Sequence, residues 1–355
     1  MKRRGLKVII SLAFALGVLL FFPIKTDKQY FFHTGWRQEL PESFVFGNAA
    51  VKNAALFPFA GQNIFGYCSE TGDIVYSEPV VYDVTGSSEY FINYSSVAET
   101  LLIKNEIGEI VSTIAVVGFP FIRNDRLFIL DVDRCGVSEW DFTGKRLWGK
   151  RYSSIITCFD CNKDEAIIGL IDGHILLYNN KGEYVYRDEF TGSRIRTVYG
   201  IALSRTGSYF SVIEGIDPQK LMLFERREEG YVSVYSQELS DPFRREVFLQ
   251  FDDDENYLFY EQNDVLTRLS VKWKTLRTFP VAGRPLGVSF SRPYKFHFIH
   301  SGNSEQTVVD MYNESGFHIN RFYAAPDSSV TFRNRSLFFQ RSGSIHHVTI
   351  EGADR

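Results

Sequence analysis

The stretch Trp140-Asp-Phe-Thr-Gly-Lys-Arg-Leu-Trp148 joins two short apolar strands through a turn built on Gly144. Glycine supplies the positive φ angle that such a tight connection requires. Equivalent pieces recur, with turn glycines at residues 72, 108, 144, 182, 230 and 316 and a glycine-free member around Lys274. The intervals of 36 to 48 residues leave room for four short strands each. This period predicts the blades of a β-propeller.

A second repeated piece supplies the other two strands of each blade. It consists of an apolar strand, a polar turn and another apolar strand, which is typical of a β-hairpin. Its copies are residues 119–130, 158–169, 202–213, 248–260, 288–299 and 330–339. The composition agrees, because 32 Phe and 19 Tyr against 3 Met among 355 residues favour strands over helices.

The two ends of the chain decide how many blades the ring contains. Seven strand-turn-strand pieces are followed by an eighth third-strand candidate at residues 345–352. Its unpaired edge would be an aggregation hazard, and residues 28–38 can supply the missing partner. We therefore expect an all-β propeller of eight four-stranded blades over residues 29–355, closed by its N- and C-terminal strands. Seven blades is the alternative, if residues 40–117 form one blade plus an insertion.

Residues 1–28 are predicted to form a transmembrane or signal helix. Four basic residues within positions 2–7 precede an uncharged stretch at residues 8–24, which as a helix rises about 25 Å against a hydrocarbon core of roughly 30 Å. The stretch exits through Phe21-Phe22-Pro23-Ile24-Lys25, without the small residues of a cleavage site or a nearby cysteine for lipid attachment. The sequence favours an uncleaved signal-anchor over a cleaved signal peptide, and both over a buried soluble helix.

The charge distribution bears on location and partners. Residues 1–28 contribute six Lys or Arg and one Asp, so within a total of −4 the remaining chain carries −9. This balance argues against a nucleic-acid partner, which needs a basic surface. Because a basic flank stays cytoplasmic, the propeller is expected outside the cytoplasm, anchored in the inner membrane and facing the periplasm in a bacterial host. Secretion after signal cleavage is the alternative.

The motif at residues 140–148 resembles the blade motif of quinoprotein-like propellers, in which a turn with Thr-Gly-Lys precedes an aliphatic residue and Trp. The hairpin Leu203-Ser-Arg-Thr-Gly-Ser-Tyr-Phe210 resembles that of WD-repeat-like propellers. Families with such blades include quinone-cofactor dehydrogenases and non-enzymatic envelope scaffolds, such as the outer-membrane assembly propeller lipoprotein. This chain lacks the adjacent cysteine pair of the dehydrogenases and the lipid-attachment cysteine of the lipoprotein. The resemblance implies the fold, and function must be argued from sites.

The residues that could carry chemistry do not form a recognisable motif. Cys158 and Cys161 lie three apart on a predicted strand and face opposite sides, so we expect structural cysteines. The alternatives are a disulfide among any of the four cysteines, Cys68, Cys135, Cys158 and Cys161, or a metal site. The pairs His297/His300 and His346/His347 also do not share one strand face. The acidic run at residues 252–255 occupies a hairpin turn, where a solvated turn is expected rather than a calcium site. We predict no catalytic residues, no metal and no cofactor.

Arginines gather in three loops between the predicted blades, at residues 191–196, 241–245 and 282–285. In an acidic domain they predict a basic crescent suited to a carboxylate-rich partner, an anionic polymer or a headgroup. The alternative is that they are solvated or form ion pairs with Asp188, Glu189 and Asp241. The candidate binding residues are Arg194, Arg196, Arg244, Arg245 and Arg284.

The combined expectation is an exported, membrane-tethered propeller that acts as a non-catalytic protein-binding scaffold in the cell envelope. Its partner is expected to be an envelope or membrane protein, and residues 8–24 contact the membrane itself. Two alternatives stay open. One is a periplasmic propeller enzyme, either dependent on a quinone cofactor or acting as a hydrolase or lyase. The other is the sensory ectodomain of a membrane complex.

Overall fold

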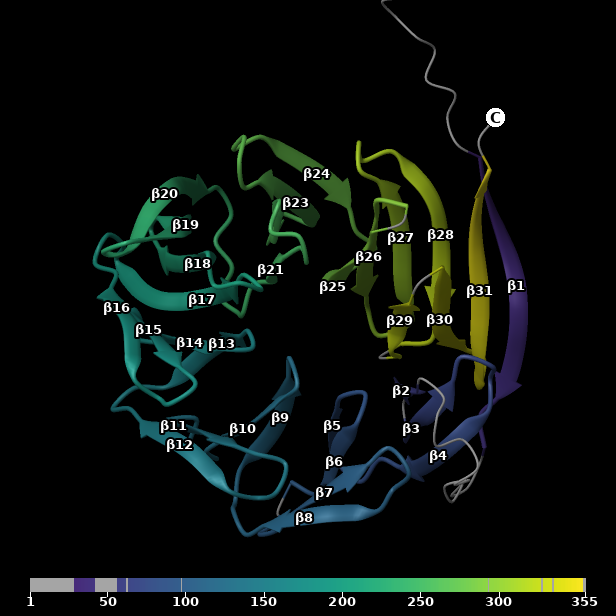
Figure 1. The fold of residues 1–355 in the computed structure, drawn as a ribbon. Helices are drawn as coiled ribbons and strands as arrows, with labels where there is room; N and C mark the ends of the chain where they lie inside the picture. Colours follow the sequence, from purple (N-terminus) through teal and green to yellow (C-terminus); the bar gives the residue numbers. More distant parts are fainter. Residues whose placement is uncertain are drawn as a thin grey trace, which may run out of the picture.

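The strands of the protein form a ring of eight antiparallel sheets around a central opening (Figure 1). The computed structural model describes residues 29–41, 56–61, 63–96, 98–292, 294–326, 328–333 and 335–353. Each sheet is one blade, and successive blades follow the order of the chain. The predicted eight-bladed, all-β propeller is confirmed.

Blade 1 contains β2 (Leu56–Ala60), β3 (Ile64–Ser69) and β4 (Ile74–Pro79). Blade 2 contains β5 (Asp83–Gly86), β6 (Tyr90–Tyr94), β7 (Leu101–Asn105) and β8 (Ile110–Ile114). Blade 3 contains β9 (Phe119–Arg123), β10 (Arg126–Leu130), β11 (Gly136–Trp140) and β12 (Arg146–Arg151). Blade 4 contains β13 (Ile156–Cys161), β14 (Glu165–Leu170), β15 (His174–Asn179) and β16 (Tyr184–Glu189).

Blade 5 contains β17 (Ile195–Leu203), β18 (Tyr209–Ile216), β19 (Gln219–Arg227) and β20 (Gly230–Leu239). Blade 6 contains β21 (Leu249–Phe251), β22 (Tyr257–Gln262), β23 (Val265–Ser270) and β24 (Leu276–Pro280). Blade 7 contains β25 (Arg284–Ser291), β26 (Phe296–Gly302), β27 (Thr307–Asn313) and β28 (His318–Ala324). Blade 8 contains β29 (Val330–Arg333), β30 (Ser336–Arg341), β31 (Ser344–Ala353) and β1 (Gln29–Glu39).

Blade 1 has three strands within the described residues. Gly72 lies between β3 and β4, as Gly144 lies between the third and fourth strands of blade 3, so β2, β3 and β4 correspond to the second, third and fourth strands of other blades. Residues 42–55, which precede β2 in the chain, lie outside the described residues.

The ring closes where β1 pairs antiparallel with β31, in a register that runs from Gln29 opposite Ala353 to Glu39 opposite Ser344. These are the two segments that the sequence analysis placed together. Trp36 packs near Phe338 with ring centroids 5.9 Å apart, while Tyr30 and Phe32 contact the core shared by blades 7 and 8. The first and last described strands therefore lie side by side (Figure 1).

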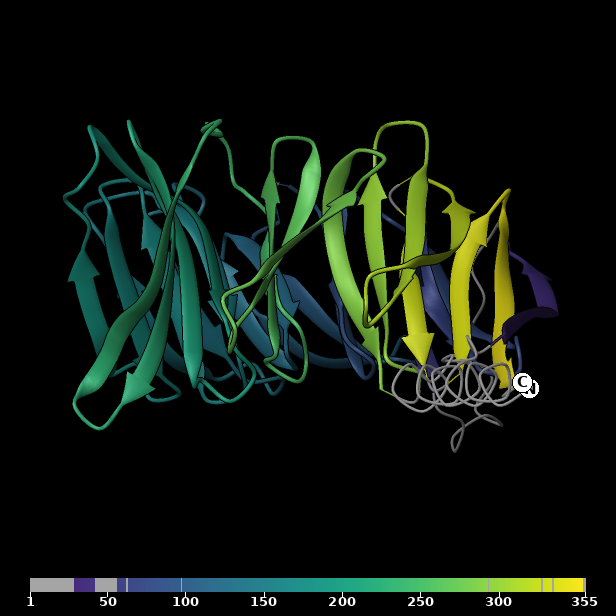
Figure 2. The ribbon, with the colours of Figure 1, turned by 90° about the horizontal axis from the view of Figure 1, so that it is seen from above.

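Up-and-down strands give the ring two different faces. One face carries the connections between first and second strands and between third and fourth strands, such as residues 124–125 and 141–145, and we call it the turn face. The loop face carries the connections between second and third strands and between blades, such as residues 131–135 and 152–155. Ala353, at the end of a third strand, lies on the turn face, as does the beginning of β1 (Figure 2).

Glycine is required at two of the repeated turns for different reasons. Gly144 has φ of 88°, in the left-handed region that favours glycine. Gly108 has φ of 84°, and a Cβ atom there would meet the Tyr76 ring of the preceding blade at 2.0 Å. The turn of one blade therefore packs on the blade before it.

The hydrophobic core lies between neighbouring blades. Between blades 4 and 5, for example, Ile167 and Leu177 pack with Val212 and Phe210, and Phe210 stacks on Phe224 at a centroid distance of 4.5 Å. Eight such clusters follow one another around the ring. The high aromatic content of the sequence fills these layers.

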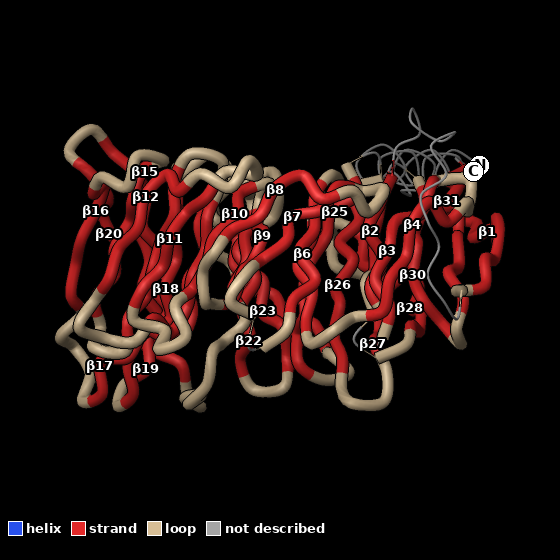
Figure 3. The backbone as a smooth tube through the Cα atoms, turned by 90° about the horizontal axis from the view of Figure 1, so that it is seen from below, coloured by secondary structure: helices blue, strands red, loops and turns tan. Residues whose placement is uncertain are grey.

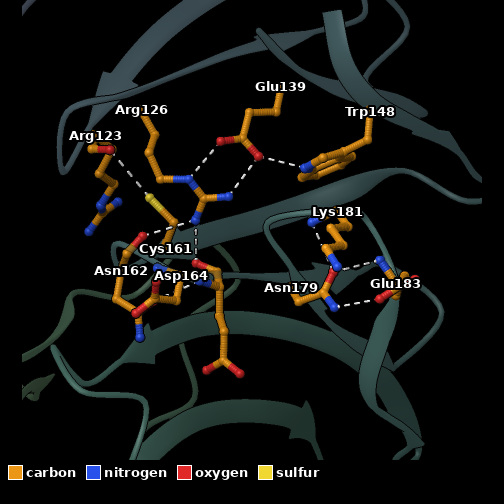
Figure 4. A network of polar contacts seen from close by, with 11 residues as sticks. Arg123, Arg126, Glu139, Trp148, Cys161, Asn162, Asp164, Asn179, Lys181 and Glu183 are labelled. Carbon is orange, nitrogen blue, oxygen red and sulfur yellow. Dashed lines mark hydrogen bonds and ion pairs between the residues drawn. The ribbon is translucent and has the colours of Figure 1, made fainter. Parts of the chain in front are cut away.

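A buried ion pair joins blades 3 and 4 (Figure 4). Arg126 donates two hydrogen bonds to the Glu139 carboxylate, both at 2.7 Å, and its remaining Nη1 donates to the carbonyl oxygens of Asn162 and Glu165 in the next blade. Trp148 donates to the same carboxylate from the outer strand. These hydrogen bonds offset the free-energy cost of burying the two charged groups. The two bonds to carbonyl oxygens of blade 4 also fix how blades 3 and 4 meet.

The described residues contain strands, turns and loops but no helix (Figure 3). None of their elements is a helix long and apolar enough to cross a bilayer. The predicted transmembrane or signal helix at residues 1–28 lies outside the described residues.

Removal of the closing strand should open the ring. A chain that starts at residue 40 loses the packing of Tyr30, Phe32 and Trp36 at about 1.5–3 kcal/mol for each buried side chain, and leaves β31 as an exposed edge. We expect a lower midpoint and a broader transition in urea unfolding than for a chain that starts at residue 26. Coincident unfolding curves for the two chains would show that closure by β1 is dispensable.

Candidate functional site

The first strands of the blades surround a central cavity. On the turn-face side, a hollow of about 390 Å³ is lined from blades 3 to 6. A second hollow of about 290 Å³, nearer the loop face, shares Arg123 and Gln250 with the first and reaches Arg284 and Leu286. The polar residues of the first hollow are Arg123, Asn124, Asp125, Asp160, Asn162, Lys163, Arg205, Gln250, Asp252 and Asp253.

Two buried carboxylates stand out in this lining. Asp160 pairs with Arg123 at 2.9 Å and accepts the backbone N–H of Leu203 at 2.7 Å. Burial raises the pKa of Asp160, and Arg123 and the Leu203 N–H act against that rise. The pair therefore links the first strands of blades 3, 4 and 5.

Asp252 follows β21 and accepts the N–H of Tyr257 at 2.7 Å, which closes the first hairpin of blade 6. Burial is the main cause that raises its pKa to about 6, and the neighbouring Asp254 adds to the rise. The expectation of a solvated turn is wrong for this residue, since Asp252 is 5% exposed. Its side chain points back to bond the hairpin, and only the rest of the run faces water.

Both carboxylates thus accept hydrogen bonds from backbone N–H groups and hold the chain in place. Among the residues that line the two hollows, we find no nucleophile paired with a general base in the geometry that catalysis requires. The lining of the two hollows combines charged residues of both signs with apolar residues, among them Phe159, Ile201 and Leu203. Such a surface can bind a small polar ligand or a chain segment.

The cysteines are all free thiols in the structure. Cys158 and Cys161 are buried in β13, and burial raises the pKa of both thiols, so they stay protonated at neutral pH. Among the described residues no group of three or more His, Cys, Asp or Glu side chains has the arrangement of a metal site.

The histidines of blade 7 and blade 8 pack among aromatic rings. His297 is fully buried against Tyr257, Phe259 and Phe290, and neither ring nitrogen has a hydrogen-bond partner among the described residues. Burial, followed by the charge of Arg268, lowers the pKa of His297 to about 3. His346 and His347 stack on Phe339 and Phe338 respectively.

All five candidate arginines lie toward the loop face, and three of them form ion pairs. Arg194 pairs with Asp217 at 2.6 Å, Arg196 with Glu189 at 2.9 Å, and Arg245 with Glu261 at 2.6 Å. Of the three acidic partners considered from the sequence, only Glu189 is used. Asp217 lies in the connection between β18 and β19, and Glu261 lies near the end of β22, 23 and 16 residues from their arginines.

Arg244 and Arg284 differ from the other three arginines. Both are exposed, and neither belongs to an ion pair within the described part of the chain. Arg284 donates one hydrogen bond, at 3.3 Å, to the Glu246 carbonyl oxygen. Of the five candidate arginines, the two without an ion pair therefore lie between blades 5 and 7.

The loop face also carries an apolar cluster that the sequence analysis did not identify. Val132, Ile155 and Ile171 are 59%, 42% and 45% exposed. Their loops are tied together, because Ile171 donates its N–H to the Ile155 carbonyl at 2.9 Å and Ile156 donates to that of Arg134 at 2.8 Å. We call these three residues the apolar cluster of blades 3 and 4. No periodic pattern marks these residues in the sequence, since each is a single residue in a different loop.

Comparison with known proteins agrees with this architecture. A family model described as beta-propeller protein matches residues 1–353. The chain belongs to this family. A relative described as an uncharacterized protein of Treponema pallidum (strain Nichols) is 24% identical over 360 residues, which cover 99% of this chain and 95% of the relative.

Solved propellers are similar in fold. The structure of BamB from Moraxella catarrhalis has a TM-score of 0.60 at 12% identity and covers 90% of this chain and 100% of its own. Sqt1 of Saccharomyces cerevisiae has a TM-score of 0.61 at 10% identity, with 91% and 98% covered, and the Dos1 propeller 0.56 at 9%, with 90% and 94% covered. At these identities the likeness concerns the fold alone.

The buried histidine predicts a measurable pH effect. The folded pKa of His297 lies below the ordinary 6.5, so the unfolded state takes up a proton first and stability falls as the pH drops below about 6.5. Through His297 the unmodified protein should lose about 2 kcal/mol of unfolding free energy between pH 7 and pH 5, and the His297→Phe variant should not show this loss. Urea unfolding at both pH values measures this difference.

The opposite pH effect of Asp252 and a matched control variant both enter the interpretation of these unfolding measurements. Asp252 acts in the opposite direction, because its raised pKa makes the folded state take up a proton first between about pH 6 and pH 4. The effect is therefore read as a difference between variants, with the exposed His33→Phe as control. Equal pH dependence of the His297→Phe variant and the unmodified protein would contradict the assignment.

Proposed function

We propose that the protein is an exported, membrane-tethered propeller that binds a partner protein in the cell envelope and has no catalytic role. The observation that carries the proposal is the apolar cluster of blades 3 and 4. The loops of its residues are held together by backbone hydrogen bonds, which lowers the entropy lost when a partner binds, and exposed apolar side chains on neighbouring loops are typical of interaction sites.

The surroundings of the cluster fit a protein partner better than a lipid or a nucleic acid. Arg151 pairs with Asp131 at 2.8 Å and also with Asp133, so charged residues of both signs border the apolar side chains. An apolar centre with a polar rim is the usual composition of a protein interface. Arg244 and Arg284 on the same face add positive charge, which suits a partner with an acidic rim.

The tether rests on the sequence of residues 1–28 together with the place where the described chain begins. Gln29 starts β1 at the turn face. A membrane segment at residues 8–24 would hold the turn face toward the bilayer and leave the loop face directed away from it. The apolar cluster would then be accessible to proteins in the compartment outside the cytoplasm.

The enzyme alternative has one supporting observation, the central cavity with the buried Asp252. Mass spectrometry under native conditions and the absorbance spectrum of protein purified from its host distinguish the two functions. A stoichiometric bound cofactor or a turnover product would favour the enzyme over the scaffold.

The tether is tested by charged substitutions in the apolar stretch. Leu16→Arg together with Leu19→Arg should cost roughly 3 kcal/mol for each charge at the bilayer centre and abolish retention in the membrane fraction. Gln38→Arg in β1 is a control that adds a charge without entering the stretch. Recovery of the unmodified protein in the soluble periplasmic fraction without residues 1–25 would replace the anchor by a cleaved signal.

The partner surface is tested by site-specific photo-crosslinking in intact cells. A photoreactive residue at Ile155 should yield a discrete crosslinked product, and the same residue at Thr143 on the turn face should not. Ile171→Asp should remove the product by placing an unpaired charge in the contact. Arg244→Glu with Arg284→Glu should weaken it in a salt-sensitive way. A product that survives Ile171→Asp would exclude the apolar cluster as the contact.

A further inference from the structure

Two aromatic side chains project from the turn face of blades 6 and 7. Trp273 lies in the turn between β23 and β24 and is 71% exposed, the largest value for a big hydrophobic side chain among the described residues. Phe317 lies in the corresponding turn of blade 7 and is 66% exposed. Trp273 precedes the positive-φ residue Lys274, where the turns of blades 1 and 3 have Thr71 and Thr143. Phe317 follows the positive-φ residue Gly316, where the same two turns have Asp73 and Lys145. The two aromatics are therefore not required by the turn.

Cations accompany both rings. The Lys272 Nζ lies 4.8 Å from the Trp273 ring centroid, and the Arg277 guanidinium lies 5.7 Å from that of Phe317. Arg277 also lies against Gly316, so the last strand of blade 6 meets the turn of blade 7. In blade 8, the exposed Arg335 sits in the first turn of the same face. None of these three cations belongs to an ion pair within the described residues, unlike Arg194, Arg196 and Arg245 on the loop face.

The chain enters the propeller beside this surface. The apolar stretch ends at Ile24 and β1 begins at Gln29, opposite Ala353 on the turn face of blade 8. Five residue steps span at most about 17 Å when fully extended. If residues 8–24 span a bilayer, as the proposed function has it, the turn face of blade 8 is held within that distance of the end of the apolar stretch. Blades 7 and 6 come next around the ring.

We propose that the turn face of blades 6 to 8 rests on an anionic lipid surface. Trp273 and Phe317 enter the headgroup region, and Lys272, Arg277 and Arg335 lie against lipid phosphates. Tryptophan prefers the membrane–water interface, and each basic residue near an anionic leaflet adds attraction. This inference rests on the tether of the proposed function.

The charges on the rest of the turn face determine how the ring would sit. On blades 6 and 7, Asp254 pairs with Arg292 and Glu314 pairs with Lys295, while Glu255 accepts a hydrogen bond from Thr206 and Asp253 lines the central cavity. Blade 5 presents Glu228 and Glu229 in its outer turn, and blade 1 presents Glu70 and Asp73. Anionic headgroups repel these carboxylates. The propeller would therefore tilt, with blades 6 and 7 lowered onto the lipid and blade 5 raised, and the loop face would remain free for the partner.

The test uses the full chain reconstituted in vesicles of phosphatidylcholine with brominated phosphatidylglycerol, in which bromine quenches tryptophan near the headgroups. The chain has four tryptophans, so Trp273→Phe defines the contribution of Trp273 by difference. In the Trp273→Phe background, Phe317→Trp places a reporter on blade 7, and Tyr82→Trp places one at a position that is 60% exposed on the loop face. We expect quenching of Trp273 and of the Phe317→Trp reporter, and none of the Tyr82→Trp reporter.

Charge reversal and flotation complete the test. Lys272→Glu with Arg277→Glu should reduce quenching of Trp273, with unchanged circular dichroism. Equal quenching of all three reporters, or of none, while the protein floats with the vesicles would overturn the lipid contact and leave the tether standing. Failure of the unmodified full chain to float would overturn the tether and this contact together.

Discussion

The pairing of β1 with β31 is the contact on which the rest of the architecture depends. In an open row of sheets, the end blades would expose one flank of their aromatic layers and one unpaired strand. Here the strand that completes blade 8 comes from the opposite end of the chain, so each blade has a neighbour on both sides. All inter-blade layers can then be buried at once, and the loops of both faces are held by a ring without an open end.

Polar contacts within the ring determine how adjacent blades align. Arg126 bonds Glu139 in its own blade and two carbonyl oxygens of the next, while Lys104 reaches across to Glu78 of the preceding blade at 2.5 Å. Nearer the centre, Asp160 and Gln250 bond backbone groups of neighbouring first strands. Aromatic layers tolerate sliding, whereas these directional bonds do not. The positions of the surface loops depend on that alignment.

The architecture could be predicted because it repeats. A turn glycine such as Gly144 marks the outer hairpin of one blade, and the spacing of such turns predicts the number of blades. The surface residues do not repeat from blade to blade, so no such pattern predicts their contacts. The sequence places Arg194 and Arg245 on the correct face, but their acidic partners are Asp217 in a loop and Glu261 in β22, which only the folded ring brings near. Similarly, Asp252 looks solvated within an acidic run, and its burial depends on the direction of one side chain. Single exposed residues such as Ile155 leave no pattern at all.

The arrangement of blade 8 also has a consequence for biosynthesis. During translation β1 is made first, and its partner β31 consists of the last described residues, so more than 300 residues separate the two strands in time as well as in sequence. Blades 2 to 7 can form successively from local hairpins as the chain is made. The ring can close only after β31 has been made. Until then, the row of blades is open and its two ends expose unpaired strands. Such a nascent chain therefore stays prone to aggregation for longer than a domain whose paired strands are all adjacent in sequence.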